Sequence, residues 1–120
     1  MLHTITNWIR PFFRKDKESY LCFHKILGFY PGDIRIYEQA LLHKSSSVKS
    51  DKGRLVNNER LEFLGDAVLE LISSEYLFFE NQTMPEGELT KLRASMVCEK
   101  ALAFCARDLE LGSYLLLGKG

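Results

Sequence analysis

Apolar residues recur at intervals of three and four along most of the chain, whereas two-residue alternation with β-branched side chains is nearly absent. The first spacing places apolar side chains on one face of a helix, and the second is typical of strands. The sequence therefore predicts an all-α fold without strands. Helices are expected at residues 19–27, 34–43, 58–79 and 99–109, and another that opens within residues 83–97.

Residues at the helix ends support these boundaries. Side chains that can cap a helix start or form a capping box precede three of the helices: Asp33, Asn57 or Asn58, and Thr83 with Glu86. Gly28 and Gly112 are placed to end the first and last helices. Residues 44–58 are rich in Ser, Lys and Asn, which predicts an exposed loop before the longest helix.

Length and composition narrow the class of protein. A chain of 120 residues is long enough for one domain. Its net charge of zero argues against electrostatic binding of nucleic acid by the whole surface, although a local basic patch could still bind it. Three cysteines without CxxC spacing disfavour a zinc site or disulfides; we expect buried free thiols, which suit the cytoplasm. No segment has the roughly 20 apolar residues of a membrane span.

The predicted helix over residues 58–79 is amphipathic, with an acidic face and an apolar face. On a helical wheel, carboxylates share a stripe roughly 80° wide: Glu59, Glu62, Asp66 and Glu70. Nearly opposite lie apolar residues that we expect to face the core: Leu61, Leu64, Val68, Ile72 and Phe79. Glu75 falls on this apolar side, which the periodicity does not explain.

The acidic stripe has two interpretations. Glu62 and Asp66, one helical turn apart, can reach one Mg²⁺ ion, although most such stripes are solvated surface. Phe63 stands beside the stripe, where it either packs under another helix or inserts into a second subunit. Gly65 lowers helix propensity by about 1 kcal/mol relative to alanine, which indicates close approach of a backbone or ligand.

Three segments carry a family resemblance. Residues 59–67, ERLEFLGDA, are similar to the signature of the ribonuclease III family of double-stranded-RNA endonucleases. Residues 37–45, YEQALLHKS, resemble the family's preceding helix, and residues 85–97, PEGELTKLRASMV, resemble the following one. The resemblance extends from about Ser19 to the end, leaving residues 1–18 as an N-terminal extension.

The resemblance implies an all-α catalytic domain that works as a homodimer, with Phe63 seated in a socket of the partner. Glu62 and Asp66 would hold Mg²⁺, which Mn²⁺ can replace, and no small-molecule cofactor is implied. Glu59 and Glu86 would line the same acidic valley. Metal-activated water would then attack the RNA backbone.

Basic residues supply candidate RNA contacts. Lys91 and Arg93 on the helix after Glu86 are candidates for phosphate contacts, as are the basic residues of the preceding loop: Lys44, Lys49, Lys52 and Arg54. Such residues are more often solvated surface side chains without a binding role.

The resemblance is incomplete. The family completes its metal site with a later aspartate and glutamate and usually adds a double-stranded-RNA-binding domain, and this sequence shows neither. We therefore expect residues 19–120 to be the N-terminal part of the catalytic domain, truncated before its last helices, and a poor or inactive nuclease alone. Two alternatives stay open: a non-catalytic RNA-associated or dimerisation module of this fold, and a structural helical bundle with an acidic solvent face.

Overall fold

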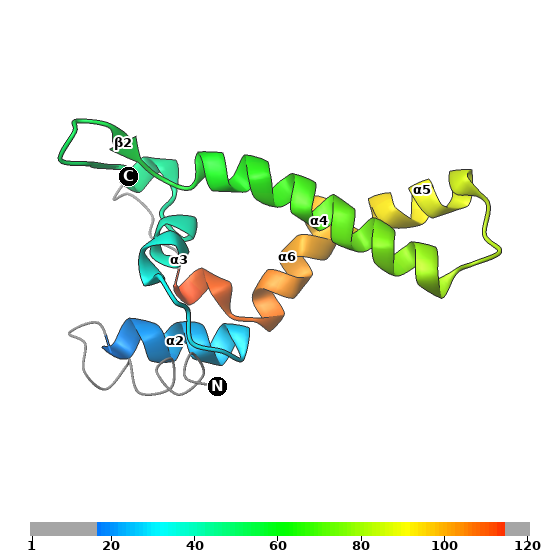
Figure 1. Ribbon diagram of the computed structural model, residues 1–120, viewed down its shortest axis with the longest axis horizontal. Coiled ribbons are helices and arrows are strands. Elements are labelled where there is room, and N and C mark those ends of the chain that lie inside the picture. Colours follow the sequence, from blue (N-terminus) through cyan, green and yellow to red (C-terminus); the bar gives the residue numbers. More distant parts are fainter. Residues whose placement is uncertain (1–16, 115–120) are drawn as a thin grey trace.

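The computed structural model describes residues 17–114 and confirms the all-α class (Figure 1). Two 3₁₀ turns accompany its helices, η2 (Lys44–Ser46) and η3 (Leu111–Ser113). The helices are α2 (Lys17–Leu27), α3 (Ile34–Ala40), α4 (Glu59–Glu80), α5 (Glu86–Met96) and α6 (Glu99–Asp108). All but the last two residues of the predicted extension at 1–18 lie outside the described part, as do residues 115–120.

The helices follow one another around the molecule (Figure 1). α2 packs against α3, α5 returns along the second half of α4, and α6 packs against α5. α6 and η3 then lead the chain back towards α2, where Lys25 Nζ lies 3.9 Å from Glu110 Oε2. None of the described helices is both long and apolar enough to cross a membrane.

The buried core lies between α2 and α3. Tyr20, Phe23 and Ile34 are its centre, and Tyr37 packs against Phe23 with ring centroids 5.6 Å apart. Gly28 ends α2 as predicted: at φ +78° its backbone N–H donates to the His24 carbonyl at 2.8 Å. Glycine adopts this left-handed conformation without steric penalty, so the chain can turn towards α3.

The prediction that the apolar side of α4 faces a core was wrong for four of its five residues, and only Leu61 is half-buried. Five apolar residues on one side of α4 are exposed, and we call them the outer face: Leu64, Val68, Leu71, Ile72 and Phe79. The buried residues of α4 are instead Ser73 and Leu77, which continue the line of Asp66 along the helix. α5 packs against α4, and all five residues of the outer face are exposed. Glu75, on the apolar side, is therefore exposed as well.

A short hairpin interrupts the expected loop. β1 (Val48–Lys49) pairs antiparallel with β2 (Leu55–Val56), with Val48 opposite Val56. The turn between them closes with a 2.8 Å bond from the Gly53 N–H to the Ser50 carbonyl, and Gly53 has φ +72°. Two-residue strands are too short to show a periodicity, which is why the sequence predicted no strand.

The predicted caps had mixed outcomes. Asp33 caps α3, accepting a 3.1 Å bond from the Arg35 backbone N–H. Asn58 holds the N-cap position of α4 without a side-chain cap bond. Thr83 is not a cap, because α5 begins after Pro85.

The cysteines are free, but they are not the buried thiols that the sequence predicted. Cys98 and Cys105 are exposed, and Cys22 is half-buried. Cys98 precedes α6 and Cys105 lies on it, and no residue of α6 is fully buried. Apolar neighbours in the sequence therefore did not translate into burial.

Candidate functional site

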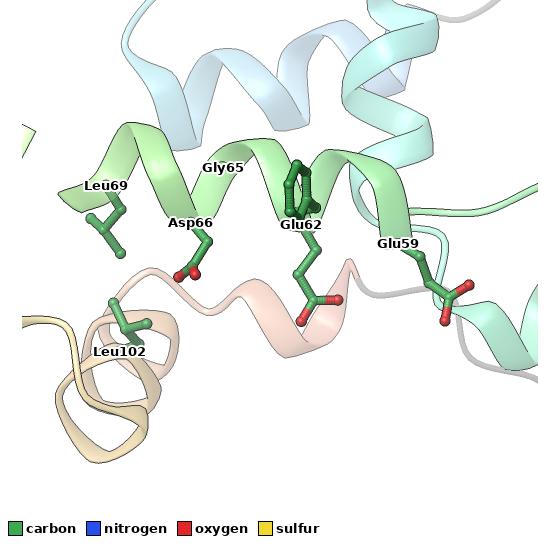
Figure 2. Close-up of a pocket in the computed structure, with 7 residues that line it drawn as sticks. Glu59, Glu62, Gly65, Asp66, Leu69 and Leu102 are labelled. Carbon is green, nitrogen blue, oxygen red and sulfur yellow. The ribbon is translucent and has the colours of Figure 1, made fainter. Parts of the chain in front are cut away.

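An open hollow of about 650 Å³ lies between the first half of α4 and α6. α6 contributes Leu102, and α4 contributes the remaining lining residues: Glu59, Glu62, Phe63, Gly65, Asp66 and Leu69. Figure 2 shows the carboxylates of Glu59, Glu62 and Asp66 on the same side of α4, with Asp66 towards Leu102 of α6 and Glu59 at the far end of the row. Three of the four residues of the acidic stripe thus line a concave surface, and Glu70 lies outside it.

Helical geometry explains this grouping. Glu59, Glu62 and Asp66 are spaced by three and four residues, which places them one above another on a helix. Glu59 and Glu62 also lie in the first turn, where the helix dipole favours negative charge. Lys44 Nζ approaches Glu59 Oε1 at 3.9 Å, an exposed pair that offsets only a few tenths of a kcal/mol of repulsion.

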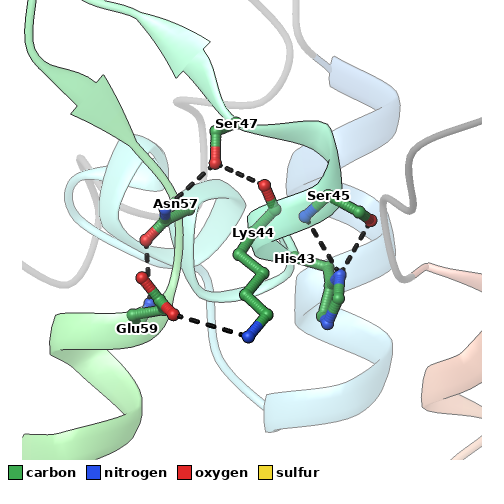
Figure 3. Close-up of polar contacts among 6 residues, drawn as sticks. All are labelled: His43, Lys44, Ser45, Ser47, Asn57 and Glu59. Carbon is green, nitrogen blue, oxygen red and sulfur yellow. Dashed lines mark hydrogen bonds and ion pairs between the residues drawn. The ribbon is translucent and has the colours of Figure 1, made fainter.

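A polar network fixes the start of α4 (Figure 3). Asn57 Oδ1 accepts a 3.1 Å bond from the Glu59 N–H, and Asn57 Nδ2 donates to Ser47 Oγ at 3.0 Å. The Asn57 carbonyl accepts from Gln39 Nε2 at 3.0 Å. Asn57, one of the two predicted caps, therefore ties Glu59 to the preceding loop and to α3.

The hollow has the right chemistry for Mg²⁺ but too few ligands. Carboxylate oxygens suit this hard cation, and Glu62 and Asp66 are one turn apart. Within residues 17–114, however, no three or more His, Cys, Asp or Glu side chains form a group that could hold a metal ion. Mg²⁺ prefers six oxygen ligands, so the remaining ones would have to come from water or from groups beyond these residues.

Two other predicted features line the hollow. Phe63 is 83% exposed, so it does not pack beneath another described helix. Gly65 has no neighbouring atom within 4 Å of the position that a Cβ would occupy, which excludes close approach by a described backbone. The ligand interpretation of Gly65 stays a prediction.

The remaining predicted residues lie away from the hollow. Glu86 lines a second cavity, of about 230 Å³, between α4 and α5, where its Oε1 accepts a 2.9 Å bond from Thr90. Arg93 lines the same cavity and donates from Nη1 to Ser74 Oγ at 2.9 Å. Lys91 is exposed on α5. The structure thus groups Glu59, Glu62, Phe63 and Asp66, and leaves Glu86, Lys91 and Arg93 apart.

Sequence reasoning missed the apolar wall of the hollow, Leu69 and Leu102. Leu69 could have been found, because it flanks the acidic stripe on the helical wheel. Leu102 could not, because its place depends on how α6 crosses beneath α4. The Arg93–Ser74 bond likewise joins residues 19 positions apart and left no local signal.

Comparisons with known proteins place this fold. A family model described as Ribonuclease-III-like matches residues 33–120. The curated Ribonuclease 3 of Phocaeicola vulgatus is 54% identical over 111 residues, covering 92% of this chain and 36% of that protein. The Ribonuclease 3 of Bacteroides thetaiotaomicron is 53% identical with the same coverage. The Ribonuclease 3 of Staphylococcus haemolyticus is 52% identical, and the match covers 78% of this chain and 38% of that protein.

Solved structures agree. Two structures of the ribonuclease III nuclease domain from Campylobacter jejuni match with TM-scores of 0.72 and 0.70 at 44% and 42% identity. The matches cover 82% and 88% of this chain, and 64% and 66% of the respective solved chains. One of them is described as showing structural flexibility in a region involved in dimer formation.

These findings define an all-α nuclease-domain fold with a carboxylate-lined hollow. The chain belongs to the ribonuclease III family. It spans just over a third of the curated relatives and about two thirds of the solved nuclease domains.

Proposed function

We propose that this chain supplies the acidic part of the active site of a Mg²⁺-dependent endoribonuclease that cleaves double-stranded RNA, acts as a homodimer, and processes rRNA and mRNA precursors in the cytoplasm. The observation that carries the proposal is the hollow of α4, where Glu59, Glu62 and Asp66 share one concave side in a ribonuclease III fold. The names and folds of the relatives support it.

Each acidic residue has a proposed role. Glu62 and Asp66 would hold Mg²⁺, and Glu59, whose backbone N–H is bonded to Asn57, would add negative charge at the same wall. When bound, the ion stabilises charge that develops on the phosphate and lowers the pKa of its water. Glu86 lies beyond the hollow, so its contribution rests on the family resemblance alone.

The proposed RNA contacts are electrostatic. Lys91 is exposed on α5, and Arg93 has N–H donors beyond the one bonded to Ser74. Both can contact phosphate oxygens, which position a duplex without reading its sequence. Double-stranded RNA is recognised mainly through its A-form shape and 2′-hydroxyls.

Activity of the 120 residues alone is expected to be low. Glu62 and Asp66 offer two carboxylates, and no larger ligand group exists among residues 17–114. Mg²⁺ loses its hydration shell reluctantly and binds weakly to so few ligands. A chain extended by the second half of a ribonuclease III nuclease domain should therefore cleave far better.

The test is cleavage of a long double-stranded RNA with Mg²⁺, comparing this chain, the extended chain, and the extended chain carrying Glu62→Gln with Asp66→Asn. We expect only the unsubstituted extended chain to cut well, with a loss in the double variant at least as large as the roughly 10–100-fold that removing outer-shell partners of a metal site costs. The matched control is Glu75→Gln with Glu80→Gln, which removes the same charge from α4 outside the hollow.

The outcomes separate the alternatives. An extended chain that binds RNA but never cleaves it would support the non-catalytic RNA-associated module. If the control variant loses as much activity as the hollow variant, the assignment of Glu62 and Asp66 fails.

The homodimer is tested separately at Phe63. Because its 83% exposed ring lies on the rim of the hollow, Phe63→Ala should shift the chain towards monomer in sedimentation velocity. Phe79→Ala, at an equally apolar and 61% exposed position of α4, is the control. An unchanged mass in the Phe63 variant would refute the dimer contact.

A further inference from the structure

A polar bond joins α5 to α4. Arg93 Nη1 donates to Ser74 Oγ at 2.9 Å in a partly buried position, across 19 positions of the chain. Within residues 17–114, no other hydrogen bond and no ion pair connects these two helices. No residue of α5 is fully buried, whereas the α2–α3 core buries residues from both of its helices. The bond therefore adds a fixed point to a loosely packed contact.

The serine is oriented to accept this bond. Ser74 Oγ donates its own hydrogen to the Glu70 carbonyl at 2.7 Å, one turn earlier on α4. The lone pairs of the hydroxyl oxygen are then left for a donor from another helix. A hydrogen bond from a charged guanidinium is stronger than one between neutral groups, and the planar fork of the guanidinium fixes its direction. Ser74 is thus a well-placed acceptor for Arg93.

Arg93 lies at the corner where α5 leads into α6. It is in the last turn of α5, and its backbone carbonyl accepts a 3.2 Å bond from the Val97 N–H at the end of the helix. Val97 and Cys98 alone separate α5 from α6. The Cys98 carbonyl accepts a 3.0 Å bond from the Leu102 N–H in the first turn of α6. Two backbone hydrogen bonds and a two-residue connection therefore link Arg93 to Leu102.

This corner sets the place of the wall that α6 gives the hollow. Leu102 is the residue of α6 that lines the hollow, and Asp66 points towards it (Figure 2). α6 packs against α5, and no residue of α6 is fully buried. A shift of the end of α5 would therefore move Leu102 relative to the carboxylates of α4.

We propose that Arg93 is a positioning residue whose bond to Ser74 braces the α5–α6 corner against α4 and so fixes the distance between Leu102 and the acidic residues of the hollow. The effect of this brace on catalysis rests on the proposed function, which places the metal ion at those acidic residues. The brace is separable from a phosphate contact, because the guanidinium has five N–H donors and only one of them donates to Ser74.

The first measurement is the distance between α4 and α6 in the 120-residue chain. Nitroxide labels are attached to Cys105, which is exposed on α6, and to the exposed position of Glu75 on α4 after Glu75→Cys. Cys22→Ser and Cys98→Ser remove the other thiols. Ser74→Ala should broaden the distance distribution measured by pulsed electron paramagnetic resonance, because it removes the acceptor of the brace.

Three further variants make the measurement specific. Ser95→Ala is the matched control, because Ser95 is an exposed serine of α5 whose hydroxyl donates to the Leu92 carbonyl of the same helix at 2.7 Å. Ser74→Thr keeps a hydroxyl and should restore the narrow distribution. Arg93→Ala should broaden the distribution as Ser74→Ala does. Circular dichroism of every variant should show unchanged helix content.

The second measurement is steady-state cleavage of duplex RNA with Mg²⁺ by the extended chain described above. Ser74→Ala should lower kcat by about tenfold or more, because a misplacement of about 1 Å far from the chemistry can cost about 100-fold. KM should change little, because the charge of Arg93 is still available to phosphate. Ser74→Thr should restore kcat, and Ser95→Ala should leave both constants unchanged.

The outcomes separate the brace from the proposed function. An unchanged distance distribution in the Ser74→Ala chain would overturn the brace and leave the proposed function standing. A broadened distribution with an unchanged kcat would overturn the role of Arg93 as a positioning residue. An extended chain that is inactive without any substitution would overturn the proposed function and with it the catalytic effect of the brace, while the distance measurement still decides whether the brace exists.

Discussion

The α2–α3 core and the outer face of α4 contain the same kinds of residues in opposite environments. Ile34 is 2% exposed between α2 and α3, whereas Ile72 is 57% exposed on α4. Both stand on helices, and both belong to apolar positions at helical spacing. The pattern of the sequence therefore shows which face of a helix is apolar, but not whether another element covers it.

The difference also has an energetic meaning. Burying an isoleucine side chain contributes about 1.5–3 kcal/mol, so Ile34 stabilises the described fold and Ile72 adds little. Covering the outer face with an apolar partner would lower the free energy of the protein. The buried residues of α4 are instead Ser73 and Leu77, and α4 packs against α5.

The largest effect is expected from a matched isoleucine pair. Ile34→Ala should lower the free energy of unfolding by about 2–4 kcal/mol, because it leaves a cavity in the core. Ile72→Ala should change it by less than about 0.5 kcal/mol, as exposed substitutions do. Urea unfolding followed by circular dichroism measures both. Equal losses would show that the outer face is covered in solution.

A matched leucine pair sharpens the comparison within α4. Leu77 is 3% exposed, whereas Leu71, six residues earlier on another face of the same helix, is 68% exposed. Leu77→Ala should destabilise the chain by about 2–3 kcal/mol in the same experiment, and Leu71→Ala by far less. A small effect at Leu77 would mean that α5 does not pack on α4 in solution.

The smallest effect is expected at Gly65, and its sign is opposite. Gly65→Ala should stabilise the chain by about 0.5–1 kcal/mol, since alanine favours a helix and nothing lies within 4 Å of the new Cβ. Gly87→Ala is the control, because Gly87 is also helical with open space around it. A destabilised Gly65 variant would indicate an unseen group against the hollow.

Local signals predicted much of the fold. The spacing of apolar residues predicted α4 to within a residue at each end, and Gly28 ended α2 as expected. Interactions between distant segments escaped prediction: the exposure of the outer face, the β1–β2 hairpin and the start of α5 after Pro85. Each depends on which elements meet in space, which periodicity cannot express.

The candidate site shows the same limit. Spacing along α4 brought Glu59, Glu62 and Asp66 together because a single helix fixes their relative positions. Glu86 lies on another helix, and the structure places it in a different cavity. The family signature was decisive for identifying the chain, whereas the extent of the ligand set could be examined only in three dimensions.

The end of α6 has a consequence for how the hollow forms. Glu110 adopts a left-handed backbone, φ 55° and ψ 33°, and its carboxylate reaches Lys25, which lies 85 positions earlier in the chain. A contact between such distant segments closes a long loop, which is entropically slow to form. The contact between Lys25 and Glu110 is therefore expected to form late in folding, whereas the wall that α6 gives the hollow can assemble earlier, because α6 packs against its chain neighbour α5.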